Sequence, residues 1–148
     1  MRNLILAFIL GVIGLVSGCA SVPMASPEAD IQAKQFVVSS GKANVYIYRN
    51  ENFGGAIAMP VSLDGRVIGR TGPMTYFQMA VEPGHHEIAS LTESTAKIEI
   101  DAKANQNHFI WQEVKMGMWQ ADSKLHEVSE EEGRKGVLEC NLIDSSAK

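Results

Sequence analysis

Cys19 is the residue whose setting points most directly to a chemical modification. It follows an apolar run of 13 residues, Leu4–Val16, and two small residues, Ser17 and Gly18. A helix needs roughly 20 apolar residues to span a bilayer, so this run is too short for a membrane span. A basic start, a short apolar run and small residues at its end are typical of a secretory signal peptide. We therefore predict that residues 1–18 are a signal peptide.

Val16-Ser17-Gly18-Cys19 resembles the lipobox of bacterial lipoproteins, in which a branched apolar residue and two small residues precede the cysteine. The resemblance implies that the Cys19 thiol receives a diacylglyceryl group, that cleavage occurs before Cys19, and that its amine is then acylated. The alternative is a plain secretory signal with a coincidental cysteine. The residue after Cys19 is Ala20. An aspartate at this position would resemble a signal for retention in the inner membrane. We expect a lipid-anchored envelope protein, facing the periplasm from the outer membrane if the host is Gram-negative.

The other groups that could do chemistry do not form a recognisable site. Cys140 lies between Leu138 and Leu142, where burial is expected; pairing with another chain is the alternative. Adjacent residues of a strand point to opposite faces, so His85 and His86 cannot readily bind one ion. The remaining histidines are His108 and His126, and no pair has the spacing of a structural zinc site. We expect neither a metal nor another cofactor.

Catalysis is not expected either. The chain has no Gly-x-Ser-x-Gly motif, and an apolar setting would raise the pKa of the Cys140 thiol. Four glutamates of the predicted strands are each explained by a position on the solvent-facing side of a strand: Glu82, Glu87, Glu99 and Glu113. A glycosidase would also need a deep cleft between two carboxylates, which a small sandwich rarely provides.

Aromatic and methionine residues are the better candidates for binding. Met116, Met118 and Trp119 lie between predicted elements, where an exposed loop would form an interaction surface. Phe53 lies in a similar glycine-containing loop. The alternative for these residues is a cap that packs over the end of the domain. A platform for a sugar ring or an apolar side chain is another candidate, formed by Tyr46, Tyr48, Tyr76, Trp111 and Trp119, although Trp111 shares strand parity with Phe109 and suits the core.

Charge restricts the possible partners. The chain has a formal net charge of −4, and removing residues 1–18 takes away Arg2 and leaves −5. An acidic domain without a basic cluster argues against nucleic acid and against charge-driven binding to anionic lipid. The expected partners are the membrane, through the lipid anchor, and an envelope protein or glycan. The sequence does not determine the oligomeric state.

The 130 residues that follow the signal peptide suit one domain. Residues 19–41 are predicted to be the lipidated start and a tether, 42–143 a β-sandwich, and 144–148 a disordered tail. Ser26-Pro27-Glu28 is typical of a helix start. That helix would extend to Phe36 and dock Ile31 and Phe36 on the domain. An extended tether of this length would hold the domain tens of Å from the membrane.

From Lys42 onward the hydrophobic period is two, as expected of strands. Asp64-Gly65 suits a two-residue hairpin turn, and Pro83-Gly84 suits a type II turn. Ser129 and Glu132 form a capping-box pattern at the start of a short C-terminal helix, which Gly133 and Gly136 should weaken. The predicted fold is mainly β: a small antiparallel sandwich of about seven strands with a short helix near each end. The expected strands lie at about 43–48, 57–63, 67–70, 75–82, 85–91, 96–101 and 109–114.

Two motifs carry a family resemblance. Val61–Gly69, centred on Asp64-Gly65, and Val81–Ile88, centred on Pro83-Gly84, resemble the PEGA-type domains of bacterial surface proteins. The wider stretch 43–142 resembles a bacterial lipoprotein family catalogued as domain of unknown function 2846. The resemblance implies a small β-sandwich and transfers no functional residue.

The expected function is therefore a membrane-anchored envelope lipoprotein whose non-catalytic sandwich binds an envelope protein or glycan. One alternative is a structural or stress-linked envelope component without a specific ligand. A second alternative is an enzyme that acts on cell-wall material.

Overall fold

The computed structural model describes residues 22–53, 57–119 and 121–146. The predicted signal peptide and the Cys19 lipidation site lie outside these residues. Among the described residues, no helix is both long enough and apolar enough to cross a membrane.

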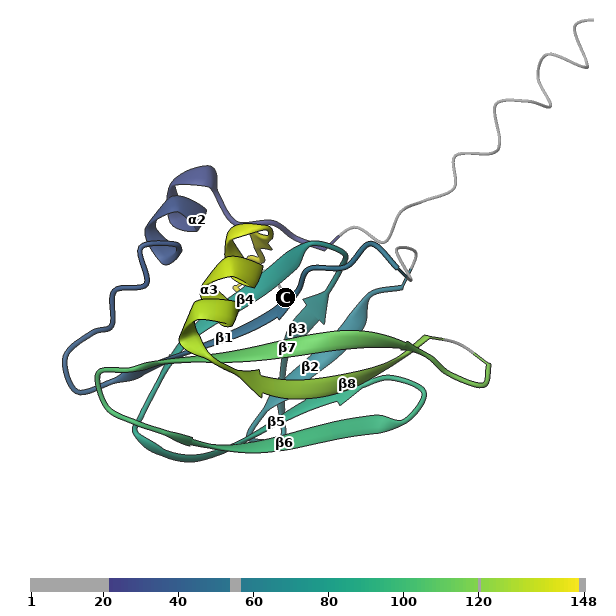
Figure 1. The fold of residues 1–148 in the computed structure, drawn as a ribbon. Helices are drawn as coiled ribbons and strands as arrows, with labels where there is room; N and C mark the ends of the chain where they lie inside the picture. The colour runs from purple at the N-terminus through teal and green to yellow at the C-terminus, as the bar shows by residue number, and fades with distance from the viewer. Residues whose placement is uncertain (1–21, 54–56, 120, 147–148) are drawn as a thin grey trace, which may run out of the picture.

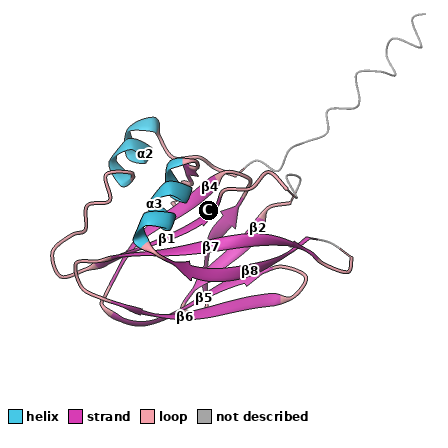
Figure 2. Cartoon of the chain, in the orientation of Figure 1, coloured by secondary structure: helices cyan, strands magenta, loops and turns pink. Residues whose placement is uncertain are grey.

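The described chain forms two β-sheets that pack face to face, and two short helices cover the outer face of one of them (Figures 1 and 2). The five-stranded sheet has the order β8-β7-β1-β4-β9, with β1 (Ala43–Arg49), β4 (Thr75–Val81), β7 (Asn107–Met116), β8 (Ala121–Val128) and β9 (Asn141–Leu142). The four-stranded sheet has the order β3-β2-β5-β6, with β2 (Met59–Leu63), β3 (Arg66–Thr71), β5 (Gly84–Leu91) and β6 (Thr95–Ala102). The helices are α2 (Pro27–Ala33) and α3 (Glu130–Leu138). The predicted small β-sandwich with a short helix near each end is confirmed.

The strand pairing differs from the prediction in two respects. The described residues form nine strands instead of about seven, because β8 and β9 were not expected. The pairing is also mixed: β1 is antiparallel to β4 and parallel to β7, and β9 is parallel to β4. Between β1 and β7 the chain crosses to the second sheet and back twice, through β2–β3 and then through β5–β6.

The two predicted turns have different outcomes. Asp64 and Gly65 have φ angles of 51° and 76°, and they join β2 to β3 as the predicted hairpin. Positive φ at both central residues is what a two-residue turn of this type requires. Pro83-Gly84, by contrast, does not make a hairpin, because β4 and β5 belong to different sheets. This short link carries the chain from one layer of the sandwich to the other.

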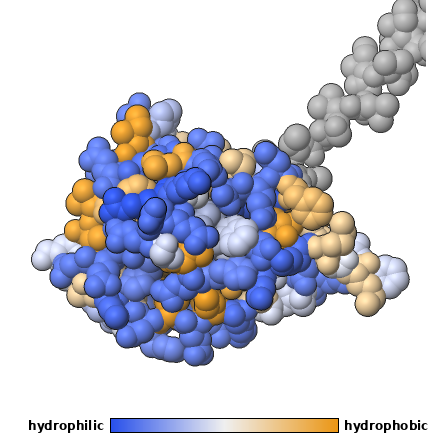
Figure 3. Space-filling view, viewed as in Figure 1, coloured by the Kyte–Doolittle hydropathy of each residue, from blue (hydrophilic) through white to orange (hydrophobic). Residues whose placement is uncertain are grey.

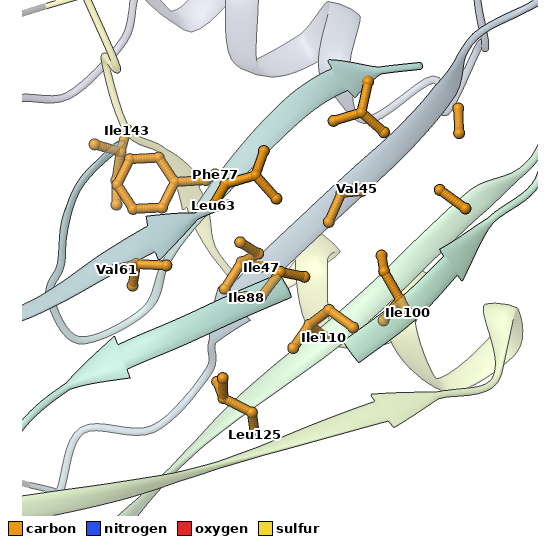
Figure 4. Close-up of a cluster of buried hydrophobic side chains, with 13 residues drawn as sticks. Val45, Ile47, Val61, Leu63, Phe77, Ile88, Ile100, Ile110, Leu125 and Ile143 are labelled. Carbon is orange, nitrogen blue, oxygen red and sulfur yellow. The ribbon is translucent and has the colours of Figure 1, made fainter. Parts of the chain in front are cut away.

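Strand β1 is buried along its whole length, and its two faces pack against different layers. Val45 and Ile47 point between the two sheets, as the alternation predicted. Figure 4 shows the side chains of both sheets meeting there, with Phe77 and Ile143 at one side and Leu125 at another. The removal of this apolar surface from water holds the two sheets together.

The opposite face of β1 is covered by α2 and α3 (Figure 1). A second buried cluster lies there, formed by Phe36, Tyr46, Tyr48, Tyr76, Phe109, Val137 and Cys140. The three tyrosines are at most 2% exposed, so the suggested tyrosine platform for a ligand is wrong. The alternation gave the direction of these side chains correctly, but the sequence pattern did not reveal that helices cover them.

The segment from Val22 to Phe36 is bound to the sandwich. Met24 forms a β-bridge with Ile143, and Val22 packs against the inner core. Helix α2 begins with the predicted N-cap at Ser26, but it ends at Ala33, before Phe36. Phe36 is buried as predicted, whereas the predicted docking of Ile31 is wrong, since Ile31 is 63% exposed. The expected stand-off of tens of Å does not apply to this part of the chain.

Two glycines allow α3 to lie directly on aromatic rings of the five-stranded sheet. A Cβ atom at Gly133 would lie 2.1 Å from Phe109 Cγ, and one at Gly136 would lie 2.2 Å from Tyr48 Cε2. No side chain fits at such distances in a close-packed interior. The N-cap predicted at Ser129 is present, with Ser129 Oγ accepting a hydrogen bond from the Glu132 N–H at 3.3 Å. The glycines therefore set the distance between helix and sheet.

Candidate functional site

The residues predicted to form a binding loop lie together at one end of the sandwich. Phe53, from the β1–β2 connection, lies beside Met116, the last residue of β7, and beside Met118 and Trp119, from the turn that follows it. With Ile57 they line a shallow depression of about 310 Å³, and we call these five residues the tip surface. Four of these residues are strongly exposed to solvent: Phe53 is 55% exposed, Met116 79%, Met118 82% and Trp119 87%. These side chains are exposed and do not pack as a cap over the sandwich end.

The tip projects because the β7–β8 hairpin is longer than the strand beside it. The last pair between β1 and β7 is Tyr48 with Trp111, whereas β7 and β8 continue to pair as far as Met116 and Ala121. The hairpin therefore extends beyond the body of the sandwich. Figure 3 shows orange and tan apolar residues gathered at this right-hand end, over the hairpin that Figure 1 shows there.

Three carboxylates, two from connections and one from strand β8, hold the tip in place. Glu51 Oε2 accepts a hydrogen bond from the backbone N–H of Val114 at 2.8 Å, and Glu93 Oε2 accepts one from the backbone N–H of Trp119 at 3.1 Å. Asp122, at the start of β8, accepts hydrogen bonds from the hydroxyl groups of Thr92 and Ser94 in the β5–β6 turn. The apolar side chains thus extend from a backbone that is fixed by hydrogen bonds to charged groups, which are stronger than neutral ones.

Arg49 positions the Phe53 side of the tip, a role that was not expected from the sequence. Its guanidinium is fully buried and donates to the Phe53 carbonyl at 3.0 Å and to the Ile57 carbonyl at 2.8 Å. Burial lowers the pKa of Arg49, and the nearby Glu51 carboxylate opposes that effect. The available signal was its position on β1, because Arg49 shares the parity of Val45 and Ile47, which face the core.

A chain of buried polar side chains leads from the interior to the base of the tip. Gln112 accepts a hydrogen bond from the Thr71 hydroxyl and donates to Ser90 Oγ at 2.6 Å. Ser123 Oγ lies 2.6 Å from the same Ser90 oxygen, and Ser123 follows Asp122 directly. Buried polar groups that satisfy one another in this way favour one arrangement of the strands.

Asp122 should make the domain sensitive to acid. Hydrogen bonds from Ser94 and Thr92 lower the pKa of Asp122 from 3.8 to about 2. A carboxyl group with a lowered folded-state pKa stabilises the fold above pH 3.8, and this contribution is lost as the pH falls toward 2. We predict that Asp122→Asn loses about 1 kcal/mol at neutral pH, a value reduced for solvent screening, and that the difference from the unmodified protein shrinks between pH 4 and 2.

Urea unfolding at a series of pH values measures this difference. Ser94→Ala removes the first donor and should reproduce part of the effect. A stability difference for Asp122→Asn that stays the same from pH 7 to pH 2 would contradict the proposed role of this carboxylate.

Each described histidine lies beside a carboxylate, and among them only His108 is buried. His86 contacts Asp64 at 2.7 Å, His126 contacts Glu113 at 2.8 Å, and the pairs His85–Glu99 and His108–Glu127 are longer. Among residues 22–53, 57–119 and 121–146, no three histidine, cysteine or acidic side chains are placed to hold one metal ion. The ring of Trp111 is half-buried and stacks on His126.

Cys140 is buried, as predicted, although its neighbour Leu138 is 57% exposed. Its thiol lies in the second cluster and contacts the Arg49 carbonyl at 3.5 Å. Burial, assisted by the Glu139 carboxylate, raises the pKa of Cys140 to about 12. The thiolate form that a nucleophile requires is therefore strongly disfavoured.

Comparison with known proteins gives one family and one relative. Residues 39–124 match a family described as "Protein of unknown function (DUF2846)". The chain is also 37% identical over 141 residues to an "Uncharacterized protein" of Haemophilus influenzae (strain ATCC 51907 / DSM 11121 / KW20 / Rd), across 94% of this chain and 84% of that protein. No solved structure matches the chain. The family match extends from just before β1 into β8 and therefore includes the tip surface.

Proposed function

The chain belongs to the DUF2846 family, and we propose that it is a lipid-anchored envelope protein whose β-sandwich docks without catalysis on another envelope component through the tip surface. The lipid is carried by Cys19. The protein faces the periplasm from the outer membrane. The observation that carries the docking proposal is the exposed apolar tip.

The distribution of exposed apolar residues supports docking at the tip. Nine large hydrophobic side chains are exposed among the described residues, and four of them are Phe53, Met116, Met118 and Trp119. Exposed apolar groups that are gathered in one place mark interaction sites, whereas isolated ones need no explanation. Tryptophan, phenylalanine and methionine are also the types enriched in protein interfaces.

The order of the tip backbone supports the same proposal. A surface that is already fixed in place loses little conformational entropy on binding. Hydrogen bonds from Glu51, Glu93 and Asp122, together with the buried Arg49, supply this order. The backbone that carries the five side chains is thus held by hydrogen bonds to the rest of the domain.

The lipobox resemblance at Val16–Cys19 supports anchorage in the envelope. The resemblance of the Asp64-Gly65 and Pro83-Gly84 motifs to PEGA-type domains of bacterial surface proteins supports the same location. A non-catalytic role is supported by the state of the Cys140 thiol, which is buried and has a pKa raised to about 12. A structural component without a specific ligand and an enzyme acting on the cell wall are the competing functions.

Photo-crosslinking in intact cells tests the docking proposal. A photoreactive phenylalanine analogue in place of Trp119 should form one dominant, reproducible adduct with an envelope component. The matched control places the same analogue at Lys124, which is exposed on β8 of the same hairpin and lies outside the tip surface. Adducts at background level from both positions would contradict docking and favour the structural function. Turnover of isolated cell-wall sacculi by the purified protein would favour the enzyme.

A further inference from the structure

We infer that the component contacted by the tip is the membrane itself: Phe53, Met116, Met118 and Trp119 enter the boundary between headgroups and acyl chains of the bilayer that holds the anchor. The inference rests on the proposed lipidation of Cys19 and names the partner of the proposed docking site. Its first basis is the shortness of the chain between the lipid and the domain.

The domain begins very near the predicted lipid. Three peptide steps separate Cys19 from Val22, which is a reach of about 10 Å even when fully extended. From there the chain is bound to the domain, because Ala25 N–H donates to the Leu142 carbonyl and Asp144 N–H donates to the Pro23 carbonyl, both at 2.9 Å. A lipid at Cys19 would therefore hold the sandwich against the bilayer.

Helix α2 strengthens this attachment. Asp30 Oδ1 accepts a hydrogen bond from the Leu142 N–H at 2.9 Å, and Lys34 Nζ donates to the Cys140 carbonyl at 2.6 Å. The carboxylate of Asp30 also pairs with Lys34 at 2.7 Å. These contacts to the C-terminal segment keep residues 22–36 from serving as a longer spacer.

The segments that carry the tip surface lie along the same outline of the domain as the start of the described chain. In Figure 1, helix α2, the start of the described chain, the β1–β2 connection and the β7–β8 turn follow one another along the upper and right-hand outline of the molecule. Met24 is 45% exposed and Ile31 is 63% exposed beside that start. These two residues and the tip surface would face one bilayer together.

The chemistry of the tip suits the membrane interface better than a polar partner. Tryptophan, with an apolar ring and one N–H group, is enriched at the level of the headgroups. The carboxylates of Glu51 and Glu93 already accept hydrogen bonds from the tip backbone. The tip surface contains no basic side chain, so its contact with lipid depends on apolar burial and not on anionic headgroups.

Fluorescence quenching of Trp119 tests the inference with the full lipidated protein. The protein is incorporated into zwitterionic phosphatidylcholine vesicles whose acyl chains carry bromine near the headgroup end. The expected result is a shift of Trp119 emission to shorter wavelength and a loss of its intensity, both unchanged by added salt. Trp119→Phe, which alters only an exposed residue, leaves Trp111 as the background to subtract.

The outcomes separate the inference from the anchorage on which it rests. If the protein floats with the vesicles but Trp119 is unquenched and keeps the emission of an exposed indole, the anchorage stands and the membrane contact is refuted. If the protein does not float with the vesicles, the anchorage fails and the inference fails with it. Quenching that requires anionic lipid and disappears in salt would also refute it, since apolar burial would then not be the cause. A protein adduct at Trp119 in cells, without quenching in vesicles, would assign the tip to a protein partner.

Discussion

Gly133→Ala is expected to destabilise the domain by about 2 kcal/mol, even though alanine favours helices more than glycine does by about 1 kcal/mol. The added Cβ atom would lie 2.1 Å from Cγ and 2.2 Å from Cβ of Phe109, a residue that is 1% exposed and held in β7. Relief of this contact would require α3 to move away from the sheet or the ring to leave its position. Overpacking of this kind costs roughly 1–3 kcal/mol, occasionally more, and therefore outweighs the gain in helix propensity.

Urea unfolding of the variant, compared with the unmodified protein, measures this change. Glu131→Ala is the matched control, since Glu131 is exposed in the first turn of the same helix and its replacement should leave the free energy of unfolding nearly unchanged. Equal or greater stability of Gly133→Ala would contradict the described packing of α3. It would show that helix propensity decides the outcome at this position.

The same glycines show the limit of sequence-based prediction for this fold. The N-cap at Ser129 was predicted because a cap depends on neighbours in the sequence. The role of Gly133 and Gly136 depends on rings from β7 and β1, which are distant in sequence. The local pattern therefore gave the helix correctly and misinterpreted its glycines as a weakness.

The strands show a similar division. Strong alternation identified β1, β4 and β7. In β8 the buried residues are Ser123 and Leu125, and Asp122, Lys124 and Glu127 are charged. A core-facing serine weakens the hydrophobic period, and the strand was missed for that reason. The parallel pairing of β1 with β7 depends on the route of the chain between the two sheets. Hydrophobic periodicity identifies strands but does not predict this route.

The tip surface was predicted in part. Composition marked Met116, Met118, Trp119 and Phe53 as candidates, but it did not decide between an exposed surface and a buried cap. That choice depends on how far β7 and β8 extend beyond β1, which is a property of the sheet. The buried Arg49 was missed because a charged residue at the end of a strand is usually taken to be solvated.

Cys19→Ser is expected to abolish lipid attachment completely, and it is the second large effect. The oxygen of serine cannot form the thioether that the lipobox resemblance assigns to Cys19. Membrane sedimentation alone is a poor readout, because an uncleaved apolar run at residues 4–16 could still hold the variant at a membrane. Incorporation of labelled fatty acid is the direct readout.

Labelling of the protein with radioactive palmitate in its bacterial host therefore tests the lipid anchor directly. Cys140→Ser is the matched control, since it replaces the other cysteine of the chain, which is buried and carries no lipid in this account. We expect that the unmodified protein and Cys140→Ser are labelled and that Cys19→Ser is not. Label that persists in Cys19→Ser, or that is absent from the unmodified protein, would contradict the lipid-anchored function.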